Sequence, residues 1–296
     1  MDLTTASKEQ LQALQNELEQ EYTGLKQAGL NLDLTRGKPS SDQLSLSNSL
    51  DGILQGDYTM DNIDLRNYGG LDGLPSAKTL FAPVIDVAID EILIGGYSSL
   101  TLMHQCMIFC HFFGLNSSDG AWVTEGKVKF LCPVPGYDRH FSICEQLGIE
   151  MIPVAIGDTG PDMDQVEALI KADPLIKGIW CVPRFSNPTG CVYSDKTVDR
   201  LAQLDNIAGN NFRIFYDNAY AVHTLSDDAP KLKSIMAAGK KYGTEDSLLI
   251  FGSTSKITFA GAGVCYLGAS KVNLAAITKH IGIVSIGPNK VDQARH

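Results

Sequence analysis

Three short motifs place reactive side chains directly after apolar segments that are typical of strands. They read SNPTG at residues 186–190, DNAY at 217–220 and STSK at 253–256. The lysine of the third motif, Lys256, can act as a nucleophile and as a base once its amine has lost a proton. In an open α/β sheet, ligands collect at the carboxyl ends of the strands. The three motifs are therefore expected to build one site around Lys256.

Two serines open a further segment that could bind an anion. Ser98 and Ser99 precede a run of apolar residues whose pattern predicts a helix at 98–113. Free backbone N–H groups and two hydroxyls would then converge at the positive end of that helix, which favours a phosphate. Simple N-capping of the helix explains the same serines, so both interpretations stay open.

Short apolar segments alternate with helical patterns from residue 76 onward. The predicted strands are 129–133, 151–155, 178–182, 213–217, 248–251 and 264–268. The predicted helices are 7–28, 79–93, 98–113, 138–147, 162–172, 195–209 and 229–242. Residues 32–68, which are rich in Gly, Ser, Asp and Asn, are expected to be mostly loop. Strands separated by helices indicate an α/β fold, a mostly parallel sheet with helices on both faces.

Composition narrows the class of protein. The 296 residues are 44% hydrophobic, with a net charge of −10 and a pI of about 5.0. That balance argues against nucleic acid or an acidic membrane as a partner, and no apolar run reaches the roughly 18 residues of a membrane span. Seven cysteines scattered through apolar segments fit reduced thiols in the cytoplasm. No metal site is expected, because the Cys and His residues at 104–111 lie in a segment that is apolar on nearly every face.

The ordered set of motifs resembles the class I/II aminotransferases, which are fold-type I enzymes of pyridoxal 5′-phosphate (PLP). TRGKP at 35–39 and YGGLDGLPSAK at 68–78 are similar to the bacterial aspartate aminotransferase subgroup. The resemblance implies an N-terminal helix and the start of a small domain at 1–50, followed by a large PLP-binding domain at 51–296. In the family the chain continues beyond this point, so the C-terminal part of the small domain is expected to be absent.

The resemblance also implies roles for five residues around the cofactor ring. Lys256 matches the lysine that holds PLP as a Schiff base and later shuttles a proton. Asp217 matches the carboxylate that pairs with the pyridine nitrogen, and Tyr220 and Asn187 match the donors to the phenolic oxygen. Tyr137 matches the aromatic residue that stacks on the ring. From the residues alone, simpler explanations remain: a surface lysine, a helix-capping aspartate, an asparagine in a turn and a tyrosine packed under a Pro-Gly turn.

A second group of residues resembles the family's phosphate site. Ser98, Ser99 and Ser253 match its hydroxyl donors. Tyr68 matches a tyrosine that reaches the phosphate of the neighbouring subunit, which implies a homodimer with shared active sites. Many relatives add an arginine about eight residues after the lysine, but residues 258–264 hold no cation.

The substrate contacts are less well marked. Gly37 matches a glycine beside the substrate, whose backbone can approach a carboxylate closely because it has no Cβ. Asn187 is expected to contact the substrate as well. Arg184 and Lys290 are basic candidates for binding an acidic substrate, with a solvated surface role as the alternative.

The implied reaction moves an amino group between aspartate, or another amino acid, and 2-oxoglutarate by a ping-pong Schiff-base mechanism. The partners would then be a small-molecule amino acid and a 2-oxo acid. Two alternatives stay open: another PLP activity on the same fold, such as a β-lyase or decarboxylase, and a truncated, non-catalytic PLP-fold protein.

Overall fold

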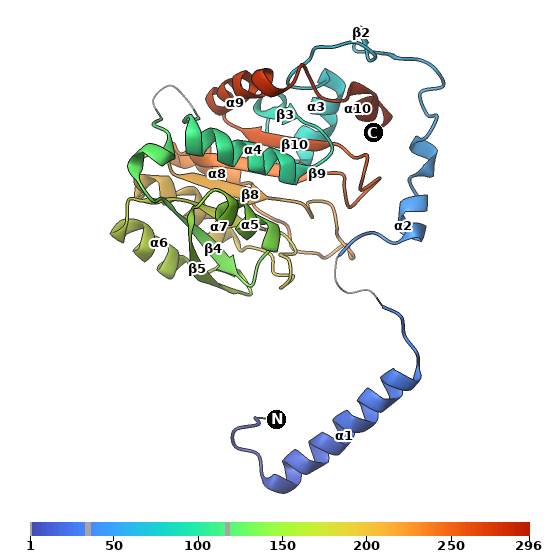
Figure 1. Ribbon diagram of the computed structural model, residues 1–296, viewed down its shortest axis with the longest axis vertical. Coiled ribbons are helices and arrows are strands. Elements are labelled where there is room, and N and C mark those ends of the chain that lie inside the picture. Colours follow the sequence, from blue (N-terminus) through green and yellow to red (C-terminus); the bar gives the residue numbers. More distant parts are fainter. Residues whose placement is uncertain (1, 33–36, 116–118) are drawn as a thin grey trace. The chain divides into compact units, whose positions relative to one another are not determined.

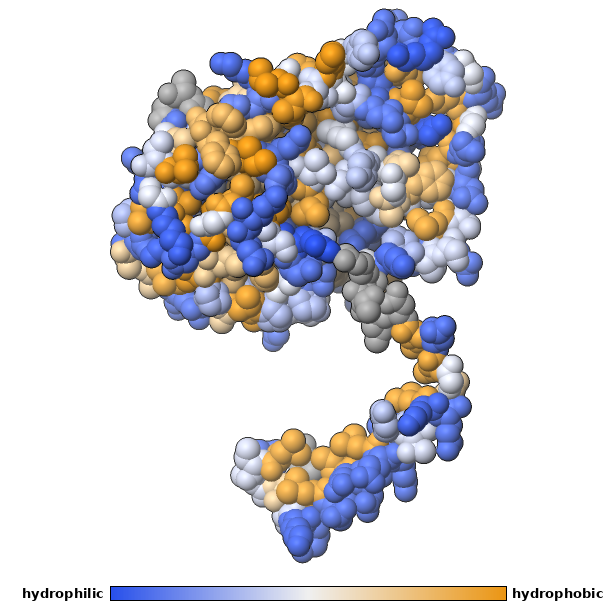
Figure 2. All heavy atoms as spheres, viewed as in Figure 1, coloured by the Kyte–Doolittle hydropathy of each residue, from blue (hydrophilic) through white to orange (hydrophobic). Residues whose placement is uncertain are grey.

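The computed structural model describes residues 2–32, 37–115 and 119–296, and the chain divides into two compact units, Met1–Lys38 and Pro39–His296. The first unit is dominated by α1, Lys8–Gln27, which begins at a capping box formed by Ser7 and Gln10 (Figure 1). No residue of α1 is buried, and an apolar stripe runs along it (Figure 2). The helix predicted at 7–28 is confirmed, whereas the domain boundary at residue 50 stays a prediction.

The second unit is built on an eight-stranded sheet in the order β3-β10-β9-β8-β7-β4-β5-β6. The strands are β3 (Ile92–Ile94), β4 (Lys129–Val134), β5 (Glu150–Gly157), β6 (Gly160–Pro161), β7 (Ile176–Cys181), β8 (Arg213–Asp217), β9 (Leu248–Ser253) and β10 (Cys265–Ala269). Neighbours from β9 to β5 pair in parallel, whereas β10 pairs antiparallel with β9 and β3, and β6 with β5. The mostly parallel sheet is confirmed, and all six predicted strands belong to it.

Helices cover both faces of this sheet (Figure 1). The helices of this unit are α2 (Ser41–Ser45), α3 (Pro75–Phe81), α4 (Ser99–Phe112), α5 (Asp138–Gln146), α6 (Met163–Ala172), α7 (Asp195–Ala202), α8 (Ile235–Tyr242), α9 (Lys271–Val284) and α10 (Lys290–Arg295), of which α2 buries no residue. The buried side chains form two cores, one with α3, α6, α7 and α8 and the other with α4, α5 and α9. Strand β8 serves both, because Ile214 and Tyr216 point into the first core and Phe215 points into the second.

The helix predicted at 79–93 is wrong over most of its length, because α3 begins earlier, at Pro75, and only residues 79–81 of the predicted range are α-helical. The α-helix ends at Phe81 and gives way to two 3₁₀ turns, Ala82–Ile85 and Ile89–Glu91. Pro83 has no backbone N–H to continue the helix, and Asp86 adopts the left-handed conformation, with a φ of 54°. The apolar residues that follow form β3 instead and pair with β10.

Other helix boundaries also differ from the predicted ones. The helix predicted at 195–209 ends as an α-helix at Ala202, and the one predicted at 229–242 begins only at Ile235, where the Ser234 side chain accepts from the N–H of Ala237. Helices α9 and α10 were not predicted. Residues 32–68 contain, besides loop, α2, a 3₁₀ turn at Asn48–Leu50 and a hairpin of β1 (Thr59–Met60) and β2 (Ile63–Asp64).

Three observations concern the class of protein. Within the part of the chain that the structure describes, no helix is both long and apolar enough to cross a bilayer. The seven cysteines are free thiols, and six of them are buried. The described residues also contain no cluster of three or more His, Cys, Asp or Glu side chains that could bind a metal ion.

Candidate active site

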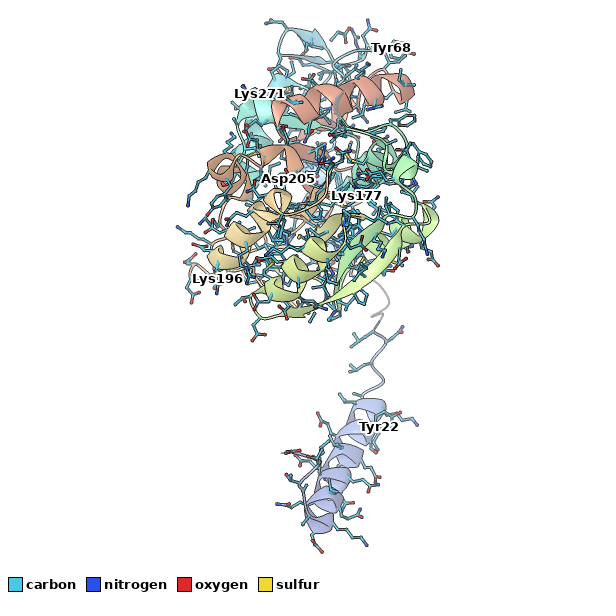
Figure 3. The ribbon with its side chains drawn as sticks, turned by 90° about the vertical axis from the view of Figure 1, so that its left-hand side faces the viewer. Tyr22, Tyr68, Lys177, Lys196, Asp205 and Lys271 are labelled. Atoms are coloured by element: carbon cyan, nitrogen blue, oxygen red, sulfur yellow. The ribbon has the colours of Figure 1, made fainter. Side chains whose placement is uncertain are left out.

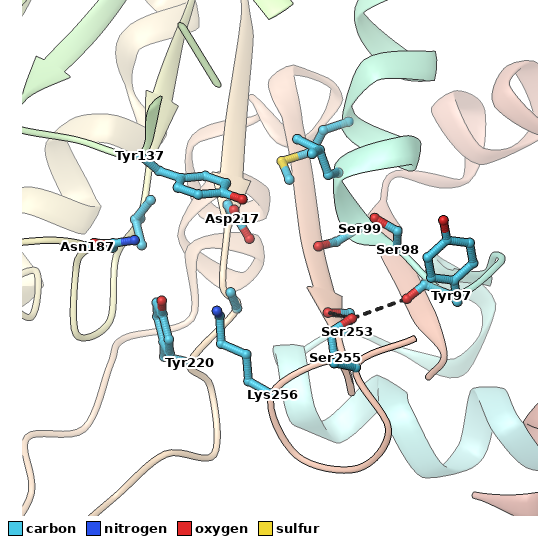
Figure 4. A pocket seen from close by; sticks show the side chains of 15 residues that line it. Tyr97, Ser98, Ser99, Tyr137, Asn187, Asp217, Tyr220, Ser253, Ser255 and Lys256 are labelled. Carbon is cyan, nitrogen blue, oxygen red and sulfur yellow. Dashed lines mark hydrogen bonds between the residues drawn. The ribbon is translucent and has the colours of Figure 1, made fainter. Parts of the chain in front are cut away.

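A cavity of about 260 Å³ opens at the carboxyl edge of the sheet, where the three motifs meet the start of α4 (Figure 4). Of the residues predicted to bind cofactor or to act in catalysis, those that line it are Ser98, Ser99, Tyr137, Asn187, Asp217, Tyr220, Ser253 and Lys256. Strands β8 and β9 are parallel, so Asp217 and Ser253, the last residue of each, come to the same edge. The structure therefore brings this predicted set together, while the role of each member remains a prediction.

The cavity has two chemically different sides (Figure 4). We call Tyr137, Asn187 and Tyr220 the aromatic side, and the four serines the serine side, comprising Ser98, Ser99, Ser253 and Ser255. Asp217 and Lys256 lie between the two sides.

Lys256 follows β9 in a turn that directs its amine into the cavity (Figure 4). Its Nζ lies 5.6 Å from the centroid of the Tyr220 ring. The backbone carbonyl of the same residue lies 3.2 Å from Nε2 of His223, whose ring makes an edge contact with Tyr220. The alternative of a surface lysine is wrong, because the side chain lines the cavity.

Asp217 is 4% exposed, and its two carboxylate oxygens differ in their hydrogen bonding. Its Oδ2 lies 3.0 Å from Nε2 of His140, whereas its buried Oδ1 has no hydrogen-bond partner among the described residues. A buried carboxylate oxygen without a partner is costly, so it marks a position for a donor from a ligand. The alternative of a helix cap is wrong, because the next α-helix begins only at Ile235.

His140 is a buried residue of this site that the sequence analysis missed. It lies in the first turn of α5, and its ring stacks on Trp180 with centroids 4.4 Å apart and planes 7° apart. The same ring makes an edge contact with Tyr137, at 5.1 Å and 87°. His140 thus connects the aromatic side to the carboxylate of Asp217. The available signal was its position three residues after Tyr137, at the start of a predicted helix.

Tyr220 is held as a neutral phenol. Burial raises its pKa above the ordinary value, and the negative charge of Asp217 raises it further. A protonated phenol can donate a hydrogen bond to an oxygen in the cavity. This supports the predicted donor role of Tyr220.

The serine side consists of hydroxyls at segment ends. Ser98 is the N-cap residue of α4, but its side chain makes no capping hydrogen bond, so capping does not explain it. Ser253 Oγ donates to Ser255 Oγ at 3.2 Å, and Ser255 Oγ donates to the carbonyl of Tyr97 at 3.2 Å (Figure 4). Ser255 also lines the cavity, although the sequence analysis did not single it out. Among the lining residues that the structure describes, Lys256 is the one Lys or Arg.

Three other predicted residues, all of the second unit, do not line the cavity. Tyr68 is 82% exposed and points outward (Figure 3). Gly37 belongs to the first unit, so its role stays a prediction, and Thr35 and Arg36 of the same motif lie outside the described residues.

The two basic candidates have other partners. Arg184 donates to the carbonyls of Ala221 at 2.5 Å and Pro230 at 3.4 Å. Lys290 is buried, so the solvated surface role is wrong for it. Neither of them lines the cavity, so the structure gives no support to a substrate-binding role for either.

Comparison with known proteins gives the family. A model of the aspartate amino-transferase family matches residues 6–296. The chain belongs to this family. It is 44% identical over 290 residues to the aspartate aminotransferase of Corynebacterium glutamicum, a match that covers 97% of this chain and 67% of that relative. This aminotransferase chain is thus shorter than its relative.

Solved structures agree with the fold. The crystal structure of an aspartate transaminase from Corynebacterium glutamicum matches with a TM-score of 0.92 and 44% identity, over 100% of this chain and 70% of that chain. The α-aminoadipate aminotransferase of Thermus thermophilus, solved with N-(5′-phosphopyridoxyl)-L-leucine, matches in fold with a TM-score of 0.68 and 20% identity, over 88% of this chain and 61% of that chain. The chain is therefore an aminotransferase with the fold-type I architecture.

Aminotransferases of this fold type use PLP, and the cavity fits that group. The unpartnered Oδ1 of Asp217 suits a protonated ring nitrogen, the serine hydroxyls suit a phosphate, and the amine of Lys256 suits an aldehyde.

Proposed function

We propose that this aminotransferase holds PLP in the cavity between the aromatic and serine sides, with Lys256 as the residue that attaches it. The observation that carries the proposal is the unpartnered Oδ1 of Asp217, buried in the cavity that Lys256 also lines. PLP, when bound, supplies an electron sink for the carbanion of an amino acid.

The residues of the aromatic side would orient the ring. Asp217 would accept from the ring nitrogen through Oδ1, while His140 donates to Oδ2 and keeps the carboxylate in place. Tyr137 would stack on the ring, and Tyr220 and Asn187 would donate to its phenolic oxygen. The amine of Lys256 would move a proton at the Cα of the substrate.

The serine side would hold the phosphate. Ser98, Ser99, Ser253 and Ser255 offer four hydroxyls, and the first turn of α4 adds backbone N–H groups. All of these donors are neutral, so the binding energy would be shared among several hydrogen bonds.

The proposed substrates are aspartate and 2-oxoglutarate, exchanged in ping-pong order, so that the first product leaves before the second substrate binds. The choice of aspartate rests on the name of the Corynebacterium glutamicum relative. Gly37 and Asn187 are proposed to contact the substrate, with the backbone of Gly37 beside its carboxylate.

We also propose that the active form is a cytoplasmic homodimer, in which Tyr68 of each subunit reaches the phosphate bound by its neighbour. Exposed apolar side chains surround the end of α9, with Ile283, Val284 and Ile286 each more than 60% exposed. The carbonyl of Ile286 accepts from the N–H of Gly69, so this patch adjoins the loop of Tyr68. Exposed apolar surface of this kind is typical of protein–protein interfaces.

The test is a visible absorption spectrum of the chain with added PLP, followed by borohydride reduction and peptide mapping. We expect a yellow adduct that reduction fixes to Lys256 and that Lys256→Ala does not form. Addition of aspartate should then bleach the yellow species and release an equivalent of the 2-oxo acid. A folded chain without the adduct would refute the proposal.

Formation of the adduct without transfer would support a non-catalytic PLP-fold protein instead. Product analysis distinguishes the remaining alternatives, because a β-lyase or a decarboxylase releases ammonia or carbon dioxide where a transaminase releases neither.

A further inference from the structure

The short helix α10 and the residue that follows it bury polar side chains at a spacing of three. Lys290 is 4% and Gln293 3% exposed, and His296 is half-buried. Residues three apart in a helix lie on one face, so these side chains form a single polar face. Lys290 and Gln293 contact the two ends of the loop at residues 67–74, and His296 contacts the turn that carries Lys256.

Lys290 binds the loop that carries Tyr68 through the residues before and after the tyrosine. Its ammonium donates to the carbonyls of Asn67 at 2.6 Å and Gly69 at 2.9 Å, the two residues that flank Tyr68. These bonds fix the backbone of the loop and leave the tyrosine side chain pointing outward (Figure 3).

Gln293 holds the end of the same loop. Its Oε1 accepts from the N–H of Leu74 at 2.8 Å, directly before α3 begins. The approach is close, since a Cβ added to Gly73 would lie 3.2 Å from this oxygen.

His296 holds the turn of Lys256. Its Nδ1 lies 2.7 Å from the carbonyl of Asp292 and therefore carries a proton, so in the neutral ring Nε2 is an acceptor. Nε2 lies 2.7 Å from the hydroxyl of Thr258 and 3.2 Å from that of Thr254. These two threonines stand two residues after and two residues before Lys256, so His296 reaches both ends of the turn.

Stability alone does not explain this face. Burying an ammonium against neutral carbonyls costs more free energy than burying an apolar side chain of similar size, and apolar replacements of buried charged groups are often neutral or stabilising. Polar groups give directional bonds, which fix one arrangement of the segments that they join. The segments joined here carry two predicted site residues, Lys256 and Tyr68.

We propose that the polar face of α10 is a positioning element of the active site, which fixes the Lys256 turn through His296 and the Tyr68 loop through Lys290. The proposal rests on the proposed function for the significance of these two segments. The contacts themselves do not depend on the proposed function, so the positioning proposal and the proposed function can be refuted separately.

The first test is hydrogen exchange of the cofactor-free chain. His296→Ala removes the acceptor, and Thr258→Val removes one hydroxyl at nearly constant shape. Each is expected to speed exchange of amides at residues 254–264 about tenfold, as the loss of one partly buried hydrogen bond allows, with no change at residues 67–74. The double variant should add little to either single variant, because both remove the same bond.

Lys290→Met should give the opposite pattern, with faster exchange at residues 67–74 and no change at 254–264. Lys290→Arg, which keeps the charge but changes the geometry, replaces it if Lys290→Met does not fold. The matched control is Arg295→Ala, which removes an ion pair to Asp292 within the same helix and should change neither segment. Uniform loosening of the whole molecule, or no local change, would overturn the proposal.

The second test is the rate at which added PLP attaches to Lys256, followed by visible absorbance. His296→Ala is expected to slow attachment several-fold, whereas Arg295→Ala leaves it unchanged. Thr258→Ser should keep the wild-type rate, because it retains the hydroxyl. An unchanged rate in His296→Ala would contradict positioning of Lys256. Failure of the wild-type chain to attach PLP at all would instead refute the proposed function, and the exchange result would still stand.

Discussion

The aromatic side and the serine side of the cavity are built on different physical principles. Behind the aromatic side lies a closed set of buried rings, in which Trp180 stacks on His140 and His140 bonds to Asp217. The serine side has no such support. The hydroxyl of Ser253 bonds to that of Ser255, which in turn bonds to the backbone carbonyl of Tyr97.

This difference predicts unequal responses to mutation. Hydrogen bonds in a buried, water-poor network are strong and depend on one another, so the loss of one member disturbs the rest. Neutral hydroxyls that share a ligand contribute small and nearly separate amounts. Substitutions of Lys256, Asp217 or His140 should therefore strongly change activity or stability. Substitution of a single serine should change cofactor affinity only slightly.

The largest effect is expected for Lys256→Ala, which removes the only side-chain amine among the described residues that line the cavity. Loss of a positioned acid–base group alone lowers rates by about 10²- to 10⁴-fold, and loss of covalent attachment adds to this. Single-turnover assays with aspartate would measure the change. A rate within tenfold of wild type would show that another group moves the proton.

The motif order predicted this central region of the site well. SNPTG, DNAY and STSK each follow a strand, and the parallel pairing of β7, β8 and β9 brings them to one edge. That inference needs only local patterns and the general rule for α/β sheets.

His140 could not be predicted in the same way. Its partners are 40 and 77 residues away, Trp180 on β7 and Asp217 on β8, and only the folded sheet brings them together. The burial of Lys290 could not be predicted for a related reason. A lysine is usually exposed, whereas here the carbonyls of two residues far away in the sequence bind its ammonium in the interior. Strand β3 was missed because three apolar residues after a helical pattern continue that pattern.

Asp217→Asn should have the next largest effect. The amide keeps the size of the side chain but removes the charge that a protonated ring nitrogen needs. A hydrogen bond to a charged group contributes about 1.5–3 kcal/mol, so activity should fall roughly 10- to 100-fold. Measurement of kcat and KM for aspartate would test this, and a loss confined to KM would argue against an electronic role.

His140→Phe should destabilise the protein more than it disturbs the shape of the site. Phenylalanine can keep the stack on Trp180, but it leaves the buried Oδ2 of Asp217 without its donor. We expect the free energy of unfolding to fall by about 1–3 kcal/mol, the usual cost of an unsatisfied buried acceptor. Urea unfolding measures the change.

The control for that substitution is His104→Phe. His104 also bonds to another side chain, Gln146, but at the surface, so its replacement should change the free energy of unfolding by less than about 0.5 kcal/mol. If the two substitutions lowered the free energy of unfolding equally, burial of the hydrogen bond between His140 and Asp217 would add nothing to its contribution.

The smallest effect is expected for Ser253→Ala, and it tests the other half of the comparison. One neutral hydrogen bond contributes about 0.5–1.5 kcal/mol, so the affinity for PLP should weaken only about threefold to tenfold. Affinity for pyridoxal, which lacks the phosphate, should not change. Fluorescence titration with the two compounds provides the measurement. A loss of a hundredfold or more would show that Ser253 belongs to a cooperative network after all, and that the two sides of the cavity are built alike.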